Sequence, residues 1–93
     1  MKNKNIIKVR IKLDKLDDKL LIIFKKRTLL VNKILSSKTY KNQIIDKKRI
    51  KIILKRIKIK SKKNKIDPKI TNRIWKNMIW SYIDYERRNF KKK

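Results

Sequence analysis

The apolar residues in the first third of the chain recur at a helical spacing over a long stretch. Steps of three or four residues, with a single step of seven, connect Ile6, Val9, Leu13, Leu16, Leu20, Ile23, Leu30 and Ile34. This spacing is typical of one face of an α-helix, so the sequence predicts a helix from about residue 6 to about residue 38. At 1.5 Å per residue the helix would be about 50 Å long.

A helix of this length is too long for one small chain to cover. The chain has 93 residues, and a compact globule of that size is only about 30 Å across. An apolar stripe that extends beyond the globule has to be buried by another chain. The sequence therefore predicts a homodimer.

One position of the stripe carries a cation. Arg27 stands midway between Ile23 and Leu30, and a buried guanidinium needs a counter-charge or an anionic ligand. Lys38 follows eleven residues later, within about 20° on the same face and roughly 16 Å away. Arg10 lies about 25 Å from Arg27, so it could reach only the other chain's site in an antiparallel dimer. The alternative is that Arg27 reaches solvent or pairs with a carboxylate of the partner.

Two shorter helices are predicted after a loop at residues 39–45. Asp46 is a typical N-cap for the second helix, and Asp67 with Pro68 marks the start of the third. The stretch between them, residues 61–66, has the character of a basic loop. The apolar face of the second helix comprises Ile50, Ile53, Leu54 and Ile57. The apolar face of the third comprises Ile70, Ile74, Trp75, Met78, Ile79, Tyr82 and Ile83.

The predicted fold is all-α, with three helices per chain, a long first helix and an intertwined homodimer. Glycine is absent and proline occurs once, which disfavours the tight turns of β-hairpins. A stretch at residues 57–60 alternates like a strand, but a single short strand would have no partner. We expect one domain over residues 6–90, with basic tails at 1–5 and 91–93.

Glu86 falls on the apolar face of the third helix, between Trp75 and Ile79. A carboxylate placed there has to pair with a cation or hold a proton. The alternative is that the helix has frayed before residue 86 and that this side chain is hydrated.

Composition excludes several kinds of chemistry. The chain contains no cysteine and no histidine, so disulfides, thiolate catalysis and the commonest metal ligand are absent. Its seven carboxylates are dispersed, and we expect no metal site. No apolar run suits a signal peptide or a membrane span, so we expect a cytoplasmic protein.

The net charge of +25 suggests nucleic acid or an anionic membrane as a partner. Alanine and glycine, which need GC-rich codons, are both absent, whereas lysine, isoleucine and asparagine are abundant. An AT-rich genome would therefore produce much of this charge without selection for a polyanion.

The positions of the charged residues resemble those of the all-helical chorismate mutases, the family of type II chorismate mutases and isochorismate-pyruvate lyases. The first-helix pattern is Arg10, Leu16-Asp17, Lys19-Leu20-Leu21, Arg27 and Lys38. Asp46 with Arg49 resembles the opening of the family's second helix. Residues 70–86, with Asn72-Arg73-Ile74-Trp75 and Met78-Ile79, are similar to its third helix. The resemblance covers residues 9–90.

This resemblance implies two intertwined chains that share two active sites and convert chorismate to prephenate without a cofactor. Arg27, and Arg10 from the neighbouring chain, would bind the two substrate carboxylates. Lys38 would donate to the ether oxygen, on which negative charge develops. Glu86 would contact the same oxygen from its other side.

The second helix would complete the implied pocket. Arg49 would add a cation, and Asp46 would lie near the ring hydroxyl. Ile50 and Tyr82 would line the substrate site.

Three of these positions depart from the common pattern of the mutases. Glutamine is usual at position 86, so the resemblance implies that Glu86 must be protonated to help. Ile50 and Tyr82 are more similar to the isochorismate-pyruvate lyases, which form salicylate and pyruvate, whereas Asp46 is more similar to the mutases. We favour the mutase over the lyase.

A small basic nucleic-acid-binding protein is the alternative from another class. Trp80 and Tyr85, close to Arg87 and Arg88, could stack on bases. This alternative does not explain why Arg27 lies in the stripe. A membrane-surface helix is a weaker alternative, because the second and third helices have apolar faces that need a folded core. We therefore expect neither nucleic acid nor a membrane as a partner.

Overall fold

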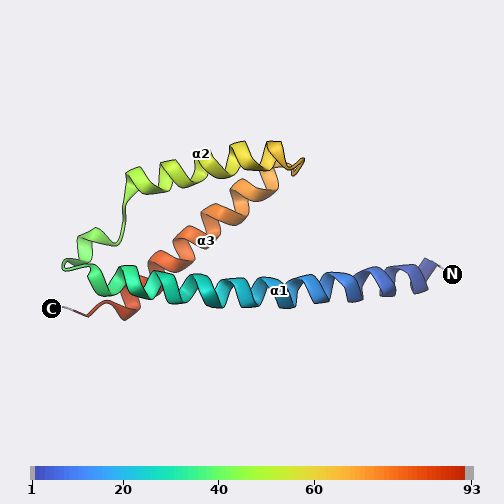
Figure 1. Cartoon of the computed structure of the whole chain (residues 1–93), viewed down its shortest axis with the longest axis horizontal. Coiled ribbons are helices and arrows are strands. Elements are labelled where there is room, and N and C mark those ends of the chain that lie inside the picture. Colours follow the sequence, from blue (N-terminus) through green and yellow to red (C-terminus); the bar gives the residue numbers. More distant parts are fainter. Residues whose placement is uncertain (1, 92–93) are drawn as a thin grey trace. The chain divides into compact units, whose positions relative to one another are not determined.

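A computed structural model describes residues 2–91, which are helical over most of that range (Figure 1). Its elements are α1 (Lys2–Ser37), the short 3-10 helix η1 (Lys41–Gln43), α2 (Lys47–Lys63) and α3 (Pro68–Asn89). No strand occurs among residues 2–91. The predicted all-α fold with three main helices is confirmed, and the strand-like stretch at 57–60 is helical.

The first helix begins earlier than predicted. Residues 2–5, expected to form a basic tail, are part of α1. The apolar periodicity begins only at Ile6, so nothing in the pattern marks the preceding turn as helical. At the other end, α1 stops at Ser37, one residue before the predicted end. Residues 92–93 of the expected C-terminal tail lie outside the described residues.

The chain divides between Lys33 and Ile34 into two compact units. The first unit consists of α1 up to Lys33. Its apolar stripe is exposed. The side chains of the stripe, from Ile6 to Ile34, are between 46% and 58% accessible in the single chain. The last of them, Ile34, is the first residue of the second unit. Four side chains of the first unit are half-buried, namely Phe24, Arg27, Thr28 and Val31.

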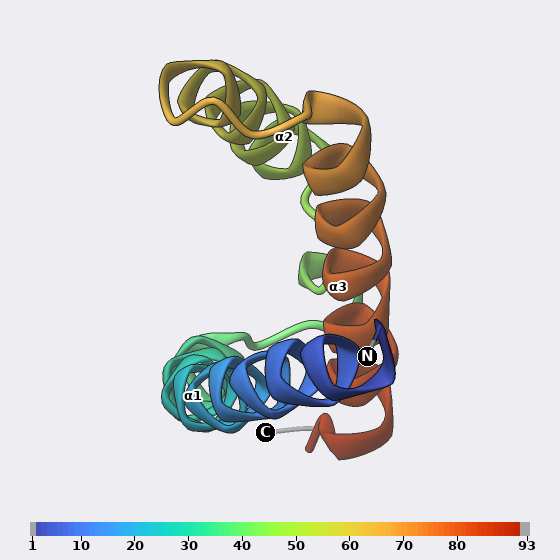
Figure 2. The ribbon, with the colours of Figure 1, turned by 90° about the vertical axis from the view of Figure 1, so that its right-hand side faces the viewer.

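The second unit encloses a small apolar core. Four buried side chains form it: Leu35 from the end of α1, Ile44 from the loop, and Ile79 and Ile83 from α3. Ile45, Ile50, Ile53, Leu54 and Phe90 pack around them. Figure 2 shows α2 and α3 joined at one end by the short connection between them. The core thus ties the end of α1, the loop and both later helices into one unit.

The connection between α2 and α3 is shorter than predicted, because residues 61–63 continue the helix. The helix ends with paired backbone bonds, from Ile66 N to the Ser61 carbonyl at 2.8 Å and from Lys65 N to the Lys62 carbonyl at 3.1 Å. This pattern is a Schellman motif, which needs a left-handed residue after the helix. Lys65 takes that role with φ 57°, in a position where glycine is the usual residue.

Side chains fix both ends of this connection. The Asp67 carboxylate accepts a hydrogen bond from Lys69 N at 2.9 Å, and Pro68 is the first residue of α3, as predicted. The buried hydroxyls of Ser61 and Thr71 lie 2.7 Å apart and join the two helices. The Ser61 hydroxyl also donates to the Ile57 carbonyl at 2.6 Å. This tertiary contact explains why a polar residue predicted to lie in a loop is buried within a helix.

Candidate functional site

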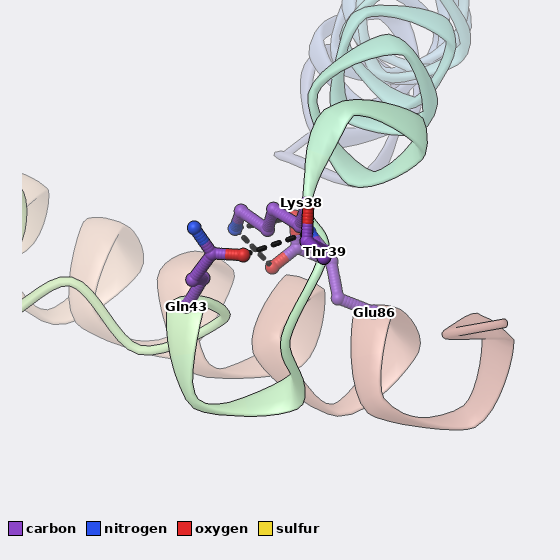
Figure 3. Close-up of polar contacts among 4 residues, drawn as sticks. All are labelled: Lys38, Thr39, Gln43 and Glu86. Atoms are coloured by element: carbon purple, nitrogen blue, oxygen red, sulfur yellow. Dashed lines mark hydrogen bonds and ion pairs between the residues drawn. The ribbon is translucent and has the colours of Figure 1, made fainter. Parts of the chain in front are cut away.

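A buried ion pair joins the end of α1 to α3 within the second unit (Figure 3). Lys38 Nζ lies 3.3 Å from Glu86 Oε2 and 3.4 Å from Glu86 Oε1. The two side chains are only 17% and 9% exposed. Since α3 continues to Asn89, the alternative of a frayed helix at Glu86 is wrong, and the predicted pairing of this carboxylate with a cation is confirmed.

The turn after Lys38 is held by a side-chain amide. Gln43 Oε1 accepts hydrogen bonds from the backbone N–H groups of Thr39 and Tyr40, at 2.7 and 2.8 Å. Both donors lie just after the end of α1 at Ser37. The Lys38 N–H donates to the Leu35 carbonyl at 3.1 Å. Figure 3 shows that the Gln43 bond to Thr39 and the Lys38–Glu86 pair lie next to each other.

An open hollow of about 680 Å³ lies beside this turn, between the end of α1 and the start of α2. Its lining residues are Lys38, Gln43, Ile45, Asp46, Lys47 and Lys48. Three of these are cations and one is a carboxylate. The N-terminus of α2 adds the positive end of a helix dipole. The hollow therefore favours an anionic ligand.

Asp46 has two roles in the structure. Its carboxylate caps α2 by accepting a bond from Arg49 N at 3.0 Å, which confirms the predicted N-cap. The same residue lines the hollow. The Arg49 side chain is exposed and does not line the hollow.

The other two predicted lining residues have contacts of their own. Ile50 packs against the apolar core of the second unit. Tyr82 is half-buried and meets Tyr85 edge-on, with ring centroids 6.3 Å apart. Both stay predictions as substrate contacts.

Arg10 and Arg27 belong to the first unit. Arg10 is exposed on α1. Arg27 is half-buried, and its Nη1 atom is shielded from solvent. A shielded guanidinium agrees with the inference that this position faces inward. Whether these arginines bind substrate stays a prediction.

Sequence reasoning missed four residues of the hollow, namely Gln43, Ile45, Lys47 and Lys48. The two lysines are the first residues after the Asp46 N-cap, and their position at a helix N-terminus could have identified them as an anion-binding pair. Gln43 accepts from the N-cap Tyr40 as the third residue of η1, a place where glutamine is a known cap residue, but tyrosine is not a usual N-cap and so did not mark the motif.

The aromatic residues considered for base stacking differ in exposure. Trp80 is 48% exposed. Tyr85 is half-buried and packs against Tyr82, which leaves less of its ring for stacking on a base. Arg87 lies 4.0 Å from Asp84 in an exposed pair. Nucleic-acid binding stays an alternative prediction.

Two further properties concern the described residues only. No helix within residues 2–91 is long and apolar enough to cross a membrane. The same range contains no group of three or more acidic, histidine or cysteine side chains arranged to hold a metal ion.

Comparison with known proteins gives one match. The model of the family described as chorismate mutase type II matches residues 9–87, which is most of the chain and includes every residue of the candidate site. Searches of the curated proteins and of the solved structures found no match.

Proposed function

We propose, because the chain belongs to the chorismate mutase type II family, that it rearranges chorismate to prephenate. In this reaction an ether C–O bond breaks while a C–C bond forms in the same molecule. No electrons or groups are exchanged with a second reactant, so no cofactor is required. The enzyme's task is to hold a compact conformer of the substrate and to stabilise the charge that develops on the ether oxygen.

The observation that carries this proposal is the buried Lys38–Glu86 pair beside a cationic hollow. In the proposed mechanism Lys38 turns its ammonium from Glu86 to the ether oxygen of the substrate. The ammonium would need to move only a short way, because Lys38 already lines the hollow. The Lys38 side chain is only 17% exposed, and a charged donor with little access to water stabilises a developing oxyanion strongly.

Glu86 would contact the ether oxygen from its other side. In the structure the Glu86 carboxylate accepts from Lys38 Nζ and the residue is 7% exposed, so the two side chains that would flank the oxygen already lie in contact.

The two substrate carboxylates would be bound by arginines of α1. We propose that Arg27 binds one carboxylate and that Arg10 of the neighbouring chain binds the other. The exposed apolar stripe of α1 supports the dimer that this arrangement needs, since a stripe of this length is rarely left in water. Two such chains would form an intertwined homodimer with shared sites.

The remaining contacts are proposed for α2 and α3. Asp46 would bind near the ring hydroxyl, and Arg49 would add a cation to the pocket. Ile50 and Tyr82 would line the substrate. Lys47 and Lys48 would raise the concentration of the dianionic substrate at the hollow.

An isochorismate-pyruvate lyase is the second candidate of the same fold. Ile50 and Tyr82 favour it, because these residues are more similar to the lyases, whereas Asp46 favours the mutase. In either case we expect a cytoplasmic protein.

A product assay tests the proposal directly. The purified protein is incubated with chorismate and, separately, with isochorismate, and prephenate, salicylate and pyruvate are separated by chromatography. We expect prephenate from chorismate. Salicylate with pyruvate from isochorismate would favour the lyase instead. A folded dimer inactive on both substrates would make nucleic-acid binding the leading hypothesis.

A further inference from the structure

Gln43, in the turn between α1 and α2, lines the hollow but belongs to none of the proposed substrate contacts. Gln43 lies five residues after Lys38, and its amide oxygen accepts the backbone N–H groups of Thr39 and Tyr40 at 2.7 and 2.8 Å. Its neighbour Ile44 is anchored in the core at 4% exposure. Gln43 thus connects a fixed point of the core to the residues that directly follow Lys38.

This geometry restricts the backbone on both sides of Lys38. On one side, the Lys38 N–H donates to the Leu35 carbonyl at 3.1 Å, and Leu35 is a core residue. On the other side, the Thr39 and Tyr40 N–H groups both donate to the Gln43 amide oxygen. Loss of the Gln43 acceptor would therefore free the backbone directly after the lysine.

We propose that Gln43 is a positioning residue for Lys38: its two backbone hydrogen bonds hold the turn that aims the Lys38 ammonium at Glu86 and at the adjoining hollow. The position of a lysine ammonium depends on its four side-chain torsions and on its backbone. A mobile backbone would therefore widen the range of positions that the Lys38 ammonium takes. A shift of about 1 Å in a charge-stabilising donor can change a rate by about 100-fold. The catalytic part of this inference rests on the proposed function, whereas the positioning part does not.

The test compares Gln43→Met with Gln43→Glu. Methionine has a similar length and no strong acceptor, whereas glutamate keeps an acceptor oxygen at the same place. We expect Gln43→Met to lower kcat for prephenate formation about tenfold, with KM changed less than about threefold. Gln43→Glu should retain kcat within about threefold. Equal kcat values for Gln43→Met and the wild type would overturn the catalytic part.

Asn64→Leu serves as a matched control for stability. The Asn64 amide donates to the Lys60 carbonyl at 2.8 Å at the end of α2, so the variant also loses one side-chain bond to the backbone at a helix end. It should lower the unfolding midpoint in urea as Gln43→Met does, while kcat stays unchanged. A fall in kcat equal to that of Gln43→Met would show that general loosening, rather than positioning, is responsible.

A second measurement does not depend on activity. A double-mutant cycle of Lys38→Met and Glu86→Gln in urea unfolding measures the coupling between the two side chains. Repeated in the Gln43→Met background, the coupling should fall by at least half. An unchanged coupling would overturn the positioning of Lys38 by Gln43. If the wild type converts neither chorismate nor isochorismate, the proposed function fails and this cycle alone decides the inference.

Discussion

The two units of the chain use the same kinds of side chain with opposite results. In residues 34–91, four apolar side chains are buried and five more pack around them. In residues 2–33, the apolar side chains at the stripe positions are all close to half accessible. Both segments are rich in lysine and isoleucine. The difference is that α2 folds back on α3 through a short turn, whereas the stripe of α1 up to Lys33 lies in a unit of its own.

This comparison distinguishes the features that form within one chain from those for which we propose a second chain. The Lys38–Glu86 pair, the Gln43 turn and the hollow all form within the second unit. The arginines proposed for the substrate carboxylates lie in the first unit, whose apolar face is not closed by its own chain. We therefore expect substrate binding to depend on association more strongly than the local geometry of Lys38 does.

The largest effect should follow from a charge placed in the apolar stripe. Burying a leucine is worth about 1.5–3 kcal/mol, and a two-fold dimer loses it twice. Leu20→Asp should therefore raise the dimer dissociation constant by at least about 100-fold, measured by sedimentation equilibrium. The control is Lys25→Gln at a polar position of α1, which lowers the charge of each chain by the same amount. It should stay dimeric. If Leu20→Asp sedimented with the mass of the wild-type dimer, the stripe would not be the interface.

The next largest effect concerns the second unit alone. Removing Lys38 would leave Glu86 buried without a partner, so Lys38→Met is best compared in the Glu86→Gln background. We expect kcat to fall by about 100- to 1,000-fold, with unchanged helicity in circular dichroism. Lys41→Met, at an exposed lysine of η1, is the control. Full activity without Lys38 would remove it from the mechanism.

Mixing two inactive variants tests whether the units of different chains cooperate. If each site takes Arg27 from one chain and Arg10 from the other, a mixed dimer of Arg10→Ala and Arg27→Ala has one intact site. Half of the dimers are mixed after random exchange, so roughly a quarter of the wild-type activity should return. Heterodimers confirmed by mass spectrometry without any recovered activity would place both arginines in the same chain's site.

The smallest effect concerns stability within the second unit. A left-handed conformation costs a residue other than glycine about 1–2 kcal/mol, part of which is returned by the greater freedom of glycine in the unfolded chain. Lys65→Gly should raise the unfolding free energy by up to about 1 kcal/mol in urea without changing the dimer mass. Lys58→Gly, at an exposed position within α2, should lower it by about 1 kcal/mol. A lower unfolding free energy for Lys65→Gly than for the wild type would contradict the inference that the left-handed conformation strains Lys65.

Local signals explain which parts of this fold could be predicted. Asp46 and Asp67 cap their helices through bonds to residues two or three positions away, so the sequence contains the whole motif. The end of α2 lacked such a signal, because a lysine occupies the left-handed position where glycine would have marked the stop. The burial of Ser61 depends on Thr71, ten residues away, and was missed for that reason.

The candidate site could be predicted only in part, for a related reason. The helical register indicated that Glu86 needs a cation or a proton, but the partner is Lys38, 48 residues away, and only the folded loop brings it there. The roles proposed for Arg10 and Arg27 would depend on a second chain, which periodicity can predict but cannot place. Gln43 bonds to residues three and four positions before it, but the N-cap tyrosine of η1 is not a residue type that marks a cap.

The short connection between α2 and α3 has a consequence for how the protein assembles in time. The contacts that it closes, such as the one between Ser61 and Thr71, join residues near each other in sequence, and such contacts form quickly. Their formation involves one chain and has a rate independent of protein concentration. Burial of the stripe by the second chain that we propose would be a bimolecular event. Refolding should therefore show a fast phase that dilution leaves unchanged, followed by a slower phase whose rate rises with concentration.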